Sequence, residues 1–203
     1  MAVSGERARP AGRPRSVETH RAILNAAVHL LEEGCYRDLS VENIAQVAGV
    51  GKQTIYRWYD SKADLLLDAF LSRYTESLPP MVAGGEPLAN FREYLHRLVA
   101  FLPSPAMDKA YRVLFAEAQF EQAFRQRVGE FVLKRRRDFA RGFILSAIHK
   151  GQISADADPD LVVDMILSPI MYKFLATVTP PDRAFVDKVF DTILTALPPA
   201  KMA

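Results

Sequence analysis

Apolar residues along this chain recur with the period of an α-helix, and no stretch shows the clean alternation of a β-strand bounded by hairpin turns. The clearest apolar stripe lies within residues 17–33. It is formed by Ile23, Ala26, Ala27, Leu30 and Leu31, which stand at i, i+3, i+4, i+7 and i+8 and so share one face of a helix. Because this period appears repeatedly along the chain, the fold is predicted to be all-α.

Glycine, proline and capping residues divide the chain into separate helices. Gly34 is expected to take the left-handed conformation that ends the first helix, and Gly49 breaks the second. Asp158 followed by Pro159 is typical of a helix start, with an N-cap before proline at the first helical position. The predicted helices cover residues 17–33, 41–48, 52–59, 62–77, 87–102, 107–118, 121–150, 159–178 and 182–197.

Composition and charge divide the chain into three predicted parts. Residues 1–16 contain prolines and glycines but almost no sizeable apolar side chain, so they are predicted to form a flexible arm. Prolines and glycines between positions 79 and 85 separate a small N-terminal bundle, 17–78, from a larger C-terminal bundle, 79–203. The net charge of +2 belongs to the arm, which carries +3, whereas the remaining residues sum to −1.

The overall composition excludes several classes of protein. A hydrophobic content of 49% is too high for a disordered chain. The single cysteine, Cys35, rules out a disulfide framework and fits a reducing compartment, so the cytoplasm is the expected location. No apolar run reaches the ~18 residues that a membrane span needs, and no membrane partner is expected.

The residue types that catalysis or cofactor binding requires do not occur at the required spacings. The four histidines form no His-Glu-x-x-His pattern, and a paired-cysteine site is impossible. The run Gly49-Val50-Gly51-Lys52 lacks the Ser or Thr that follows the lysine of a phosphate loop. The acidic residues from Asp156 to Asp164 include Pro159 and lack the glycine of a calcium loop. We therefore expect no enzymatic activity, no metal and no cofactor.

Residues 40–59 carry the strongest functional pattern, because two short helices meet there at a turn that contains glycine, as in a helix-turn-helix. Ala45 is small enough for a close helix crossing, and Gly49 can take a positive φ. The side chains left facing outward include no carboxylate and suit a groove walled by phosphates. They are Lys52, Gln53, Thr54, Tyr56 and Arg57. The spacing by itself is equally consistent with an ordinary αα-hairpin on a surface.

The run from about His20 to Phe70 resembles the DNA-binding domain of the tetracycline-repressor (TetR) family. The matching segments follow one another in order and without gaps, at residues 22–27, 34–36, 40–45, 48–52, 54–59 and 61–65. The resemblance implies a homodimeric transcriptional regulator, usually a repressor, that binds a palindromic operator on double-stranded DNA. It also implies release from that operator by a small effector.

The resemblance implies roles for single residues as well. Ser40 matches the residue that caps the first helix of the motif and often touches phosphate. Tyr56 matches a tyrosine that contacts the DNA backbone, and Lys62 matches a frequent phosphate-contacting lysine. Together with the outward face, the predicted DNA-contacting residues are Ser40, Lys52, Gln53, Thr54, Tyr56, Arg57, Trp58 and Lys62.

Three positions depart from the pattern of the family. Gly51 stands where a serine-like cap is common, so the second helix of the motif is expected to start more loosely. Trp58 replaces the usual histidine, keeps a ring N–H donor and adds bulk. Tyr59 replaces the usual phenylalanine, and its hydroxyl is expected to need a partner or water.

The N-terminal arm contains Gly12-Arg13-Pro14-Arg15, which resembles the Gly-Arg-Pro core that lies in narrow A·T-rich minor grooves. The strong negative potential of such a groove favours inserted guanidinium groups. Arg13 and Arg15 are therefore predicted to contact DNA. Charge runs are as often simply solvated, so a basic tail in water is the other interpretation.

For the C-terminal bundle, the resemblance implies a ligand cavity among the central helices and a dimer interface from the last two. Residues 88–197 are rich in aromatic side chains with few obvious buried charges, which favours an apolar or aromatic effector. The cationic run 134–137 is interpreted as a solvated face. The predicted pocket residues are Tyr94, Phe101, Tyr111, Phe115, Phe143 and Met165.

Two apolar stripes near the C-terminal end predict the dimer contact. They lie on the last two helices and would pack against their symmetry mates as a four-helix contact. A dimer also has a functional reason, because one short helix contacts too few base pairs and two can read a palindrome. The stripes consist of Leu161, Met165, Ser168 and Tyr172 on one helix and Phe185, Val189 and Ile193 on the next.

The expected function is therefore that of a homodimeric, effector-responsive DNA-binding regulator. One alternative is a ligand-independent or architectural DNA-binding protein of the same fold. A second alternative is a protein-interaction module whose bundle only dimerises.

Overall fold

The computed structural model describes residues 17–34, 36, 39–77 and 85–197, and within them it contains helices and no strand. The all-α prediction is therefore confirmed for this part of the chain. The elements are α1 (Val17–Glu33), α2 (Val41–Ala48), α3 (Lys52–Tyr56), α4 (Lys62–Ser77), α5 (Pro87–Phe101), α6 (Pro105–Phe120), α7 (Gln122–Val128), the π-helical segment η1 (Gly129–Lys134), α8 (Arg135–His149), α9 (Pro159–Ala176) and α10 (Arg183–Ala196).

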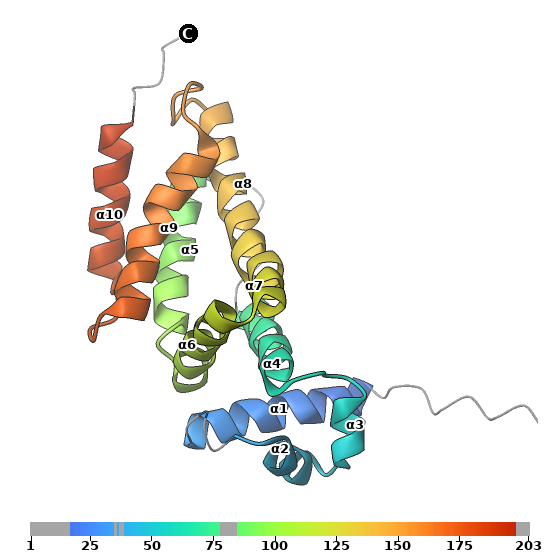
Figure 1. The fold of residues 1–203 in the computed structure, drawn as a ribbon. Helices are drawn as coiled ribbons and strands as arrows, with labels where there is room; N and C mark the ends of the chain where they lie inside the picture. The colour runs from blue at the N-terminus through green and yellow to red at the C-terminus, as the bar shows by residue number, and fades with distance from the viewer. Residues whose placement is uncertain (1–16, 35, 37–38, 78–84, 198–203) are drawn as a thin grey trace, which may run out of the picture.

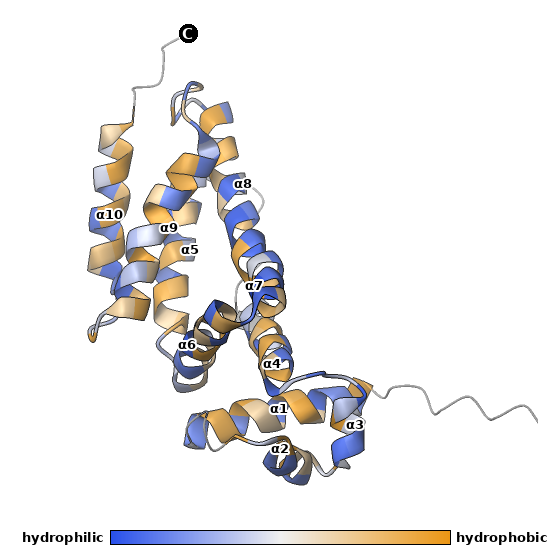
Figure 2. Ribbon diagram, in the orientation of Figure 1, coloured by the Kyte–Doolittle hydropathy of each residue, from blue (hydrophilic) through white to orange (hydrophobic). Residues whose placement is uncertain are grey.

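The first three helices lie at one end of the molecule, and α4 leads from them into the larger bundle (Figure 1). Helix α1 packs against α2, α4 and α6, and α4 also packs against α6. In the bundle, α8 packs against α5 and α9, while α10 packs against α9 and α5. In Figure 2 the ribbon of α3 is mostly hydrophilic, whereas hydrophobic residues recur along α9 and α10. The small unit is thus joined to the bundle through α4 and α6.

The turn between α2 and α3 has the geometry that its residues predict. The Oγ of Ser40 accepts the backbone N–H of Asn43 at 3.1 Å and so caps α2. Gly49 ends α2 with φ 67° and ψ 32°, in the left-handed region. Gly51 precedes α3 with φ −74° and gives it no side-chain cap, and the looser start stays a prediction. Helix α3 ends at Tyr56, earlier than the predicted residue 59.

The two glycines of this turn make a matched pair for a stability test. A Cβ at either position would meet no atom within 4 Å, so only the backbone conformation distinguishes them. We expect Gly49→Ser to lower the free energy of unfolding by about 1–2 kcal/mol, because a left-handed φ strains an L-residue. We expect Gly51→Ser to leave it unchanged or raise it by a few tenths of a kcal/mol, because serine is a better N-cap. Urea denaturation measures both, and equal losses would contradict this account.

The end of α1 differs from the prediction for Gly34. Gly34 has no left-handed φ, and its N–H donates to the carbonyl of Leu30 at 3.0 Å in a continuing right-handed turn. The ammonium group of Lys109 on α6 satisfies the last carbonyls instead. Its Nζ donates to the carbonyl oxygens of Leu31, Glu32 and Gly34 at 3.0, 3.0 and 2.7 Å. The prediction was wrong because a side chain distant in sequence supplies the cap.

The predicted single helix over residues 121–150 also needs correction. The segment is helical from Gln122 to His149, but its middle, η1, has π-helical hydrogen bonding. Short π-helical segments inside α-helices often occur at functional sites. At its C-terminal end the prediction is confirmed, since Gly151 follows with φ 70°.

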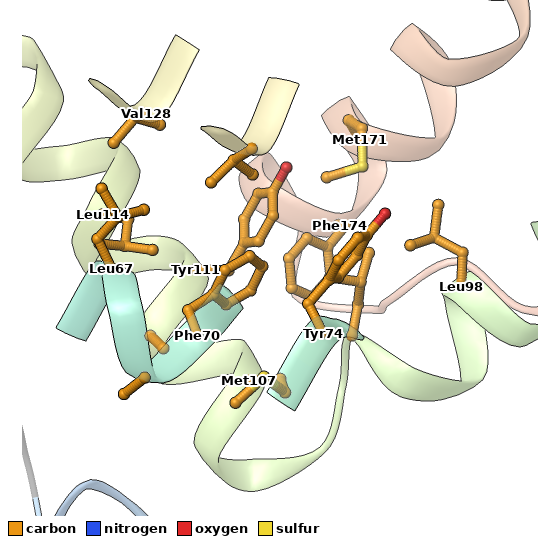
Figure 3. Packing of buried hydrophobic residues seen from close by; sticks show 14 of the residues in the cluster. Leu67, Phe70, Tyr74, Leu98, Met107, Tyr111, Leu114, Val128, Met171 and Phe174 are labelled. Carbon is orange, nitrogen blue, oxygen red and sulfur yellow. The ribbon is translucent and has the colours of Figure 1, made fainter. Parts of the chain in front are cut away.

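Aromatic side chains form the part of the core that joins α4, α6 and α9 (Figure 3). Tyr111 of α6 is fully buried, and its ring meets the rings of Phe70 and Phe174 edge-on at 5.4 and 5.5 Å between centroids. Figure 3 shows Met171 of α9 beside this group. A movement of Tyr111 would therefore be transmitted directly to α4 through Phe70.

Candidate nucleic-acid interface and C-terminal cavity

Helix α3 presents the outward face that the sequence predicts. Ile55 is buried beneath it, while Lys52, Gln53 and Arg57 are exposed and the side chain of Tyr56 is 55% exposed. Thr54 is half-buried at the edge of this surface. The structure thus brings these donors and acceptors together on one short helix, with only Ile55 committed to the core.

A carboxylate that the sequence interpretation did not consider lies beside this face. Glu42 of α2 accepts a hydrogen bond from Lys52 Nζ at 2.6 Å, and both side chains are about half exposed. The bond to Lys52 lowers the pKa of Glu42 below its usual value. Lys52 therefore meets solvent already paired, and a phosphate would compete with Glu42 for it. No local pattern connects Glu42 with Lys52, because the two residues lie on different helices and the turn between them brings them together.

The two aromatic departures from the family pattern serve the packing of this unit. Trp58 is half-buried, and its ring stacks on the imidazole of His20 with 4.5 Å between centroids. The hydroxyl of Tyr59 donates to Asp68 Oδ2 at 2.6 Å and lies 2.7 Å from His20 Nε2. Burial and the neighbouring Asp68 raise the pKa of Tyr59. The expected partner of this hydroxyl is thus found, and it connects α1 with α4.

Lys62 is engaged inside the protein. Its Nζ donates to the carbonyl oxygens of Tyr36 and Leu39 at 3.0 and 2.8 Å and lies 3.9 Å from the centroid of the Tyr36 ring. Burial and nearby Glu117 raise the pKa of Tyr36 to about 12. A lysine ammonium has three N–H donors, so one is left for a phosphate. The DNA contact of Lys62 stays a prediction, and its structural role is to hold the segment that precedes α2.

The predicted contacts of Arg13 and Arg15 fall outside the described residues, as do the arm itself and the residue Cys35. The proposed boundary between the two bundles, at residues 78–79, also lies there. These predictions stand as the sequence made them.

A cavity of about 490 Å³ opens between α6, η1, α8 and α9. That volume lies within the range of small-molecule sites. The cavity is bordered by apolar and cationic side chains together, with a single carboxylate. Its lining residues are Tyr111, Phe115, Gly129, Leu133, Lys134, Arg136, Arg137, Asp164, Leu167, Ser168, Met171 and Leu175.

Arg136 is the unusual member of this lining, because its side chain is only 6% exposed. Its Nη1 donates to the hydroxyl of Tyr111 at 2.6 Å and to the sulfur of Met171 at 3.3 Å. Burial raises the pKa of Tyr111, and the positive charge of Arg136 works in the opposite direction. The interpretation of residues 134–137 as a solvated face is therefore wrong for Arg136.

The structure does not bring the six predicted pocket residues together at this cavity. Tyr111 and Phe115 line it. Tyr94 and Phe143 are buried among the rings of α5 and α8, and Phe101 packs near Tyr74. Met165 lies on the outer face of α9, 38% exposed. Aromatic content does not distinguish core residues from lining residues.

The cavity residues that sequence reasoning missed lie mainly on η1, α8 and α9. One signal for Arg136 was present: it occupies the buried stripe that runs through Val132, Ala140, Phe143 and Ala147 at helical spacing. A charged residue in such a stripe is predicted to be buried, whatever the charge of its neighbours in sequence.

The predicted dimer residues differ in how exposed they are. On α9, Leu161, Met165, Ser168 and Tyr172 are exposed, and Tyr172 retains 69% of its surface. On α10, Phe185 and Val189 are partly buried, whereas Ile193 is 9% exposed. Two grooves of about 370 and 410 Å³ border Pro169 and Phe185. Apolar residues lie on all faces of α9, and this composition is typical of a helix that protein covers on every side.

Three contacts connect the cavity region with the helix-turn-helix unit. Lys109 of α6 caps α1, as described above. Arg127 of α7, two residues before η1, forms an ion pair with Asp64 of α4 at 2.8 Å. Tyr111 lies in the cavity wall and packs against Phe70 of α4. A change in the cavity wall can therefore reach α1 and α4 through rigid helices.

None of the helices in the described ranges is long and apolar enough to cross a membrane. No group of histidine, cysteine and acidic residues within the same ranges could hold a metal ion.

Both halves of the chain match family models. Residues 23–69 match the model described as "Bacterial regulatory proteins, tetR family", and residues 83–193 match "Tetracyclin repressor-like, C-terminal domain". The helix-turn-helix and the cavity both lie within these matched segments.

Similar proteins are found among curated sequences and solved structures. The uncharacterized HTH-type transcriptional regulator YdeS of Bacillus subtilis is 33% identical over 166 residues, which cover 82% of this chain and 83% of YdeS. The crystal structure of the TetR-family transcription regulator SCO0332 has a TM-score of 0.74 and 26% identity, and the match covers 90% of this chain and all of that one. Bacillus subtilis FadR in complex with stearoyl-CoA has a TM-score of 0.72 and 22% identity, with 88% of this chain and all of FadR covered.

Proposed function

The chain belongs to the tetracycline-repressor (TetR) family of helix-turn-helix transcriptional regulators, and from that membership we propose that it binds a palindromic operator as a homodimer. In this proposal the protein leaves the operator when a small apolar or aromatic effector enters the C-terminal cavity. The proteins of this family are transcription regulators and not enzymes. The proposal places the protein in the cytoplasm with its DNA.

The exposed outer face of α3 is the observation that carries this proposal. It offers the amide of Gln53, the hydroxyl of Tyr56 and the guanidinium of Arg57 at the end of the molecule farthest from the bundle. Glutamine and arginine are side chains that recognise adenine and guanine edges in the major groove. Ser40 and Lys52 lie beside them, where they would contact phosphates and set the position of α3.

The accessible apolar surface of α9 and α10 supports a homodimer. One α3 helix of five residues contacts few base pairs, so a specific site requires a second copy. In a symmetric dimer the same surface of both subunits is buried, which would cover Leu161, Met165 and Tyr172.

The cavity supports an effector, and its wall supports a route for release. FadR, a structural neighbour, is described with stearoyl-CoA bound, which shows that a protein of this fold can hold a ligand with a long acyl chain. In this chain Tyr111 and η1 both form the cavity wall, and they lead to α4 through Phe70 and through Arg127 with Asp64. A ligand that shifts this wall would change the spacing of the two α3 helices in the dimer.

Selection of genomic fragments bound by the full chain, followed by titration of the best fragment, tests the proposal. We expect a specific complex whose affinity falls with salt, with a log–log slope of about −0.9 for each phosphate contact. Deletion of residues 1–16 should flatten this slope if the arm touches DNA. An unselective or salt-independent interaction would contradict DNA recognition and favour the protein-interaction module.

The effector part is tested separately by thermal melting against a small-molecule library. A ligand at 100 times its dissociation constant stabilises the protein by about 2.7 kcal/mol, and a true effector must also dissociate the selected fragment. Ligands that raise the melting temperature without releasing DNA would favour the alternative of a ligand-independent DNA-binding protein.

A further inference from the structure

The charge of Arg136 is not balanced inside the protein. No carboxylate pairs with it among the described residues, and its Nε has no hydrogen-bond acceptor there. Its partners are the hydroxyl of Tyr111, the ring of Tyr111 at 5.8 Å from the guanidinium carbon, and the thioether sulfur of Met171, which is a weak acceptor; all three are neutral. An unpaired buried charge is strongly unfavourable, so a group that accepts hydrogen bonds and carries negative charge would stabilise this site.

The other cations of the lining differ from Arg136 because each of them pairs with a carboxylate, although the Nε of Arg137 also lacks a hydrogen-bond acceptor among the described residues. Arg137 forms ion pairs with Asp164 at 2.7 Å and with Asp160 at 3.6 Å. Lys134 is exposed and pairs with Asp138 at 2.6 Å. The cavity lining contains three cationic side chains and one carboxylate, and that carboxylate is already engaged. The unbalanced positive charge is therefore concentrated at Arg136, the deepest of the three.

The rest of the cavity is apolar and roomy. Phe115, Leu167 and Leu175 contribute apolar surface, and a Cβ at Gly129 would project into open space. At about 30 Å³ for each non-hydrogen atom, the volume of a water molecule in the liquid, the cavity holds a molecule of roughly a dozen such atoms with room to spare.

We propose that this cavity binds an organic carboxylate, with the carboxylate group against Arg136 and an apolar body between α6 and α9. The inference rests on the proposed function only in taking the cavity as the effector site. It narrows the effector from an apolar molecule to an amphipathic acid. A neutral thioester or ester can accept a hydrogen bond from Nε but leaves the charge of Arg136 unbalanced, so the free acid is the better ligand.

Calorimetric titration of the full chain without DNA tests this inference. The probes are decanoate and naphthoate, each compared with its primary amide, together with decanoyl-CoA. We expect each acid to bind about 10- to 100-fold more tightly than its amide, because hydrogen bonds between charged partners are stronger than neutral ones. We expect the affinity for decanoate to depend on Arg136 and the affinity for decanoyl-CoA not to show the same dependence.

Substitutions at Arg136 separate the effect of its charge from the effect of its position. Arg136→Met should abolish the preference for the acid, and Arg136→Lys should retain a reduced preference. Combining Arg136→Met with Tyr111→Phe removes both polar partners at once, so that no buried hydroxyl loses its donor. Arg135→Met, at the exposed neighbouring position, is the matched control and should leave the preference unchanged.

Gly129→Leu tests the cavity itself without touching any charge. Its side chain would enter open space, and replacing glycine within a helical segment favours folding. We expect this variant to melt no lower than the wild type and to lose binding of acids and amides alike. Unchanged acid binding in Gly129→Leu would place the acid elsewhere and overturn the inference.

The outcomes separate this inference from the function on which it rests. Equal binding of acid and amide, no binding of either, or an acid preference that survives Arg136→Met would each overturn it. The inference would also be overturned if decanoyl-CoA bound more tightly than decanoate and its binding did not change when Arg136 is replaced. If an acid binds through Arg136 but leaves the DNA complex intact, the carboxylate site at Arg136 is supported and the release of DNA through this cavity is contradicted. Release of DNA by a neutral cavity ligand, without acid preference, overturns the anion site and leaves the proposed function standing.

Discussion

Replacing Gln53 and Arg57 together by alanine should reduce affinity for the selected operator by at least about 10³-fold and leave only non-specific binding. Each side chain that reads a base edge contributes about 1–3 kcal/mol of discrimination, and a dimer carries every substitution twice. Both side chains are exposed on or beside α3, so their removal costs no core packing. Fluorescence anisotropy at constant salt, with the selected fragment and a scrambled one, measures the change.

The matched control replaces the same residue types in the C-terminal bundle. Gln126 of α7 and Arg135 of α8 are exposed, and Gln126→Ala with Arg135→Ala should bind the operator like the wild type. The melting temperatures of both double variants should agree with that of the wild type within a few degrees. Retention of specific binding by Gln53→Ala with Arg57→Ala would show that α3 does not read the DNA.

Placing aspartate at Met165 and Tyr172 should convert the dimer to monomers, with a rise of at least about 10³-fold in the dimer dissociation constant. The two residues stand two turns apart on the exposed stripe of α9, so the proposed interface would bury both. An unpaired carboxylate in an apolar interface costs several kcal/mol, and two-fold symmetry doubles the number of such groups. Light scattering over a range of protein concentrations gives the mass directly.

Phe120 provides the control for this experiment. Its side chain at the end of α6 is 88% exposed and lies outside the predicted stripe, so Phe120→Asp should remain dimeric. Because Met165 and Tyr172 are both exposed in the monomer, the double variant should keep its helical content. A dimeric double variant, or a wild type that is monomeric at micromolar concentration, would contradict the interface on α9 and α10.

The helices and the outward polar face of α3 were predictable because their signals are local. Ser40 and Asp158 cap the helices that follow them, and Gly49 and Gly151 take the left-handed conformation after the helices that precede them. The inward position of Ile55 follows from its spacing alone, and it leaves the neighbouring polar residues outside. Such features depend on a few consecutive residues, so no tertiary information is needed.

The features that were missed all depend on residues distant in sequence. Lys109 replaces the expected left-handed glycine as the cap of α1, and Glu42 pairs with Lys52 across a turn. The five aromatic residues predicted for the pocket divided between core and cavity, because an aromatic ring has the same local pattern in both, whereas Met165 lies on the outer face of α9. The residue types of η1 likewise did not predict its π-helical hydrogen bonding.

By itself, the sequence determined the all-helical fold, the sharp turn before α3 and the outward position of the polar residues of α3, since helical period, caps and glycine conformation act over a few residues. The helical spacing of the apolar residues around the run 134–137 places Arg136 on the inward side. Only the tertiary structure decided what Arg136 meets there, because α6 brings the hydroxyl of Tyr111 to it and α9 brings the sulfur of Met171. Partners that come from other helices are a property of the packing, and for that reason the chemistry of the cavity could not be read from the local sequence.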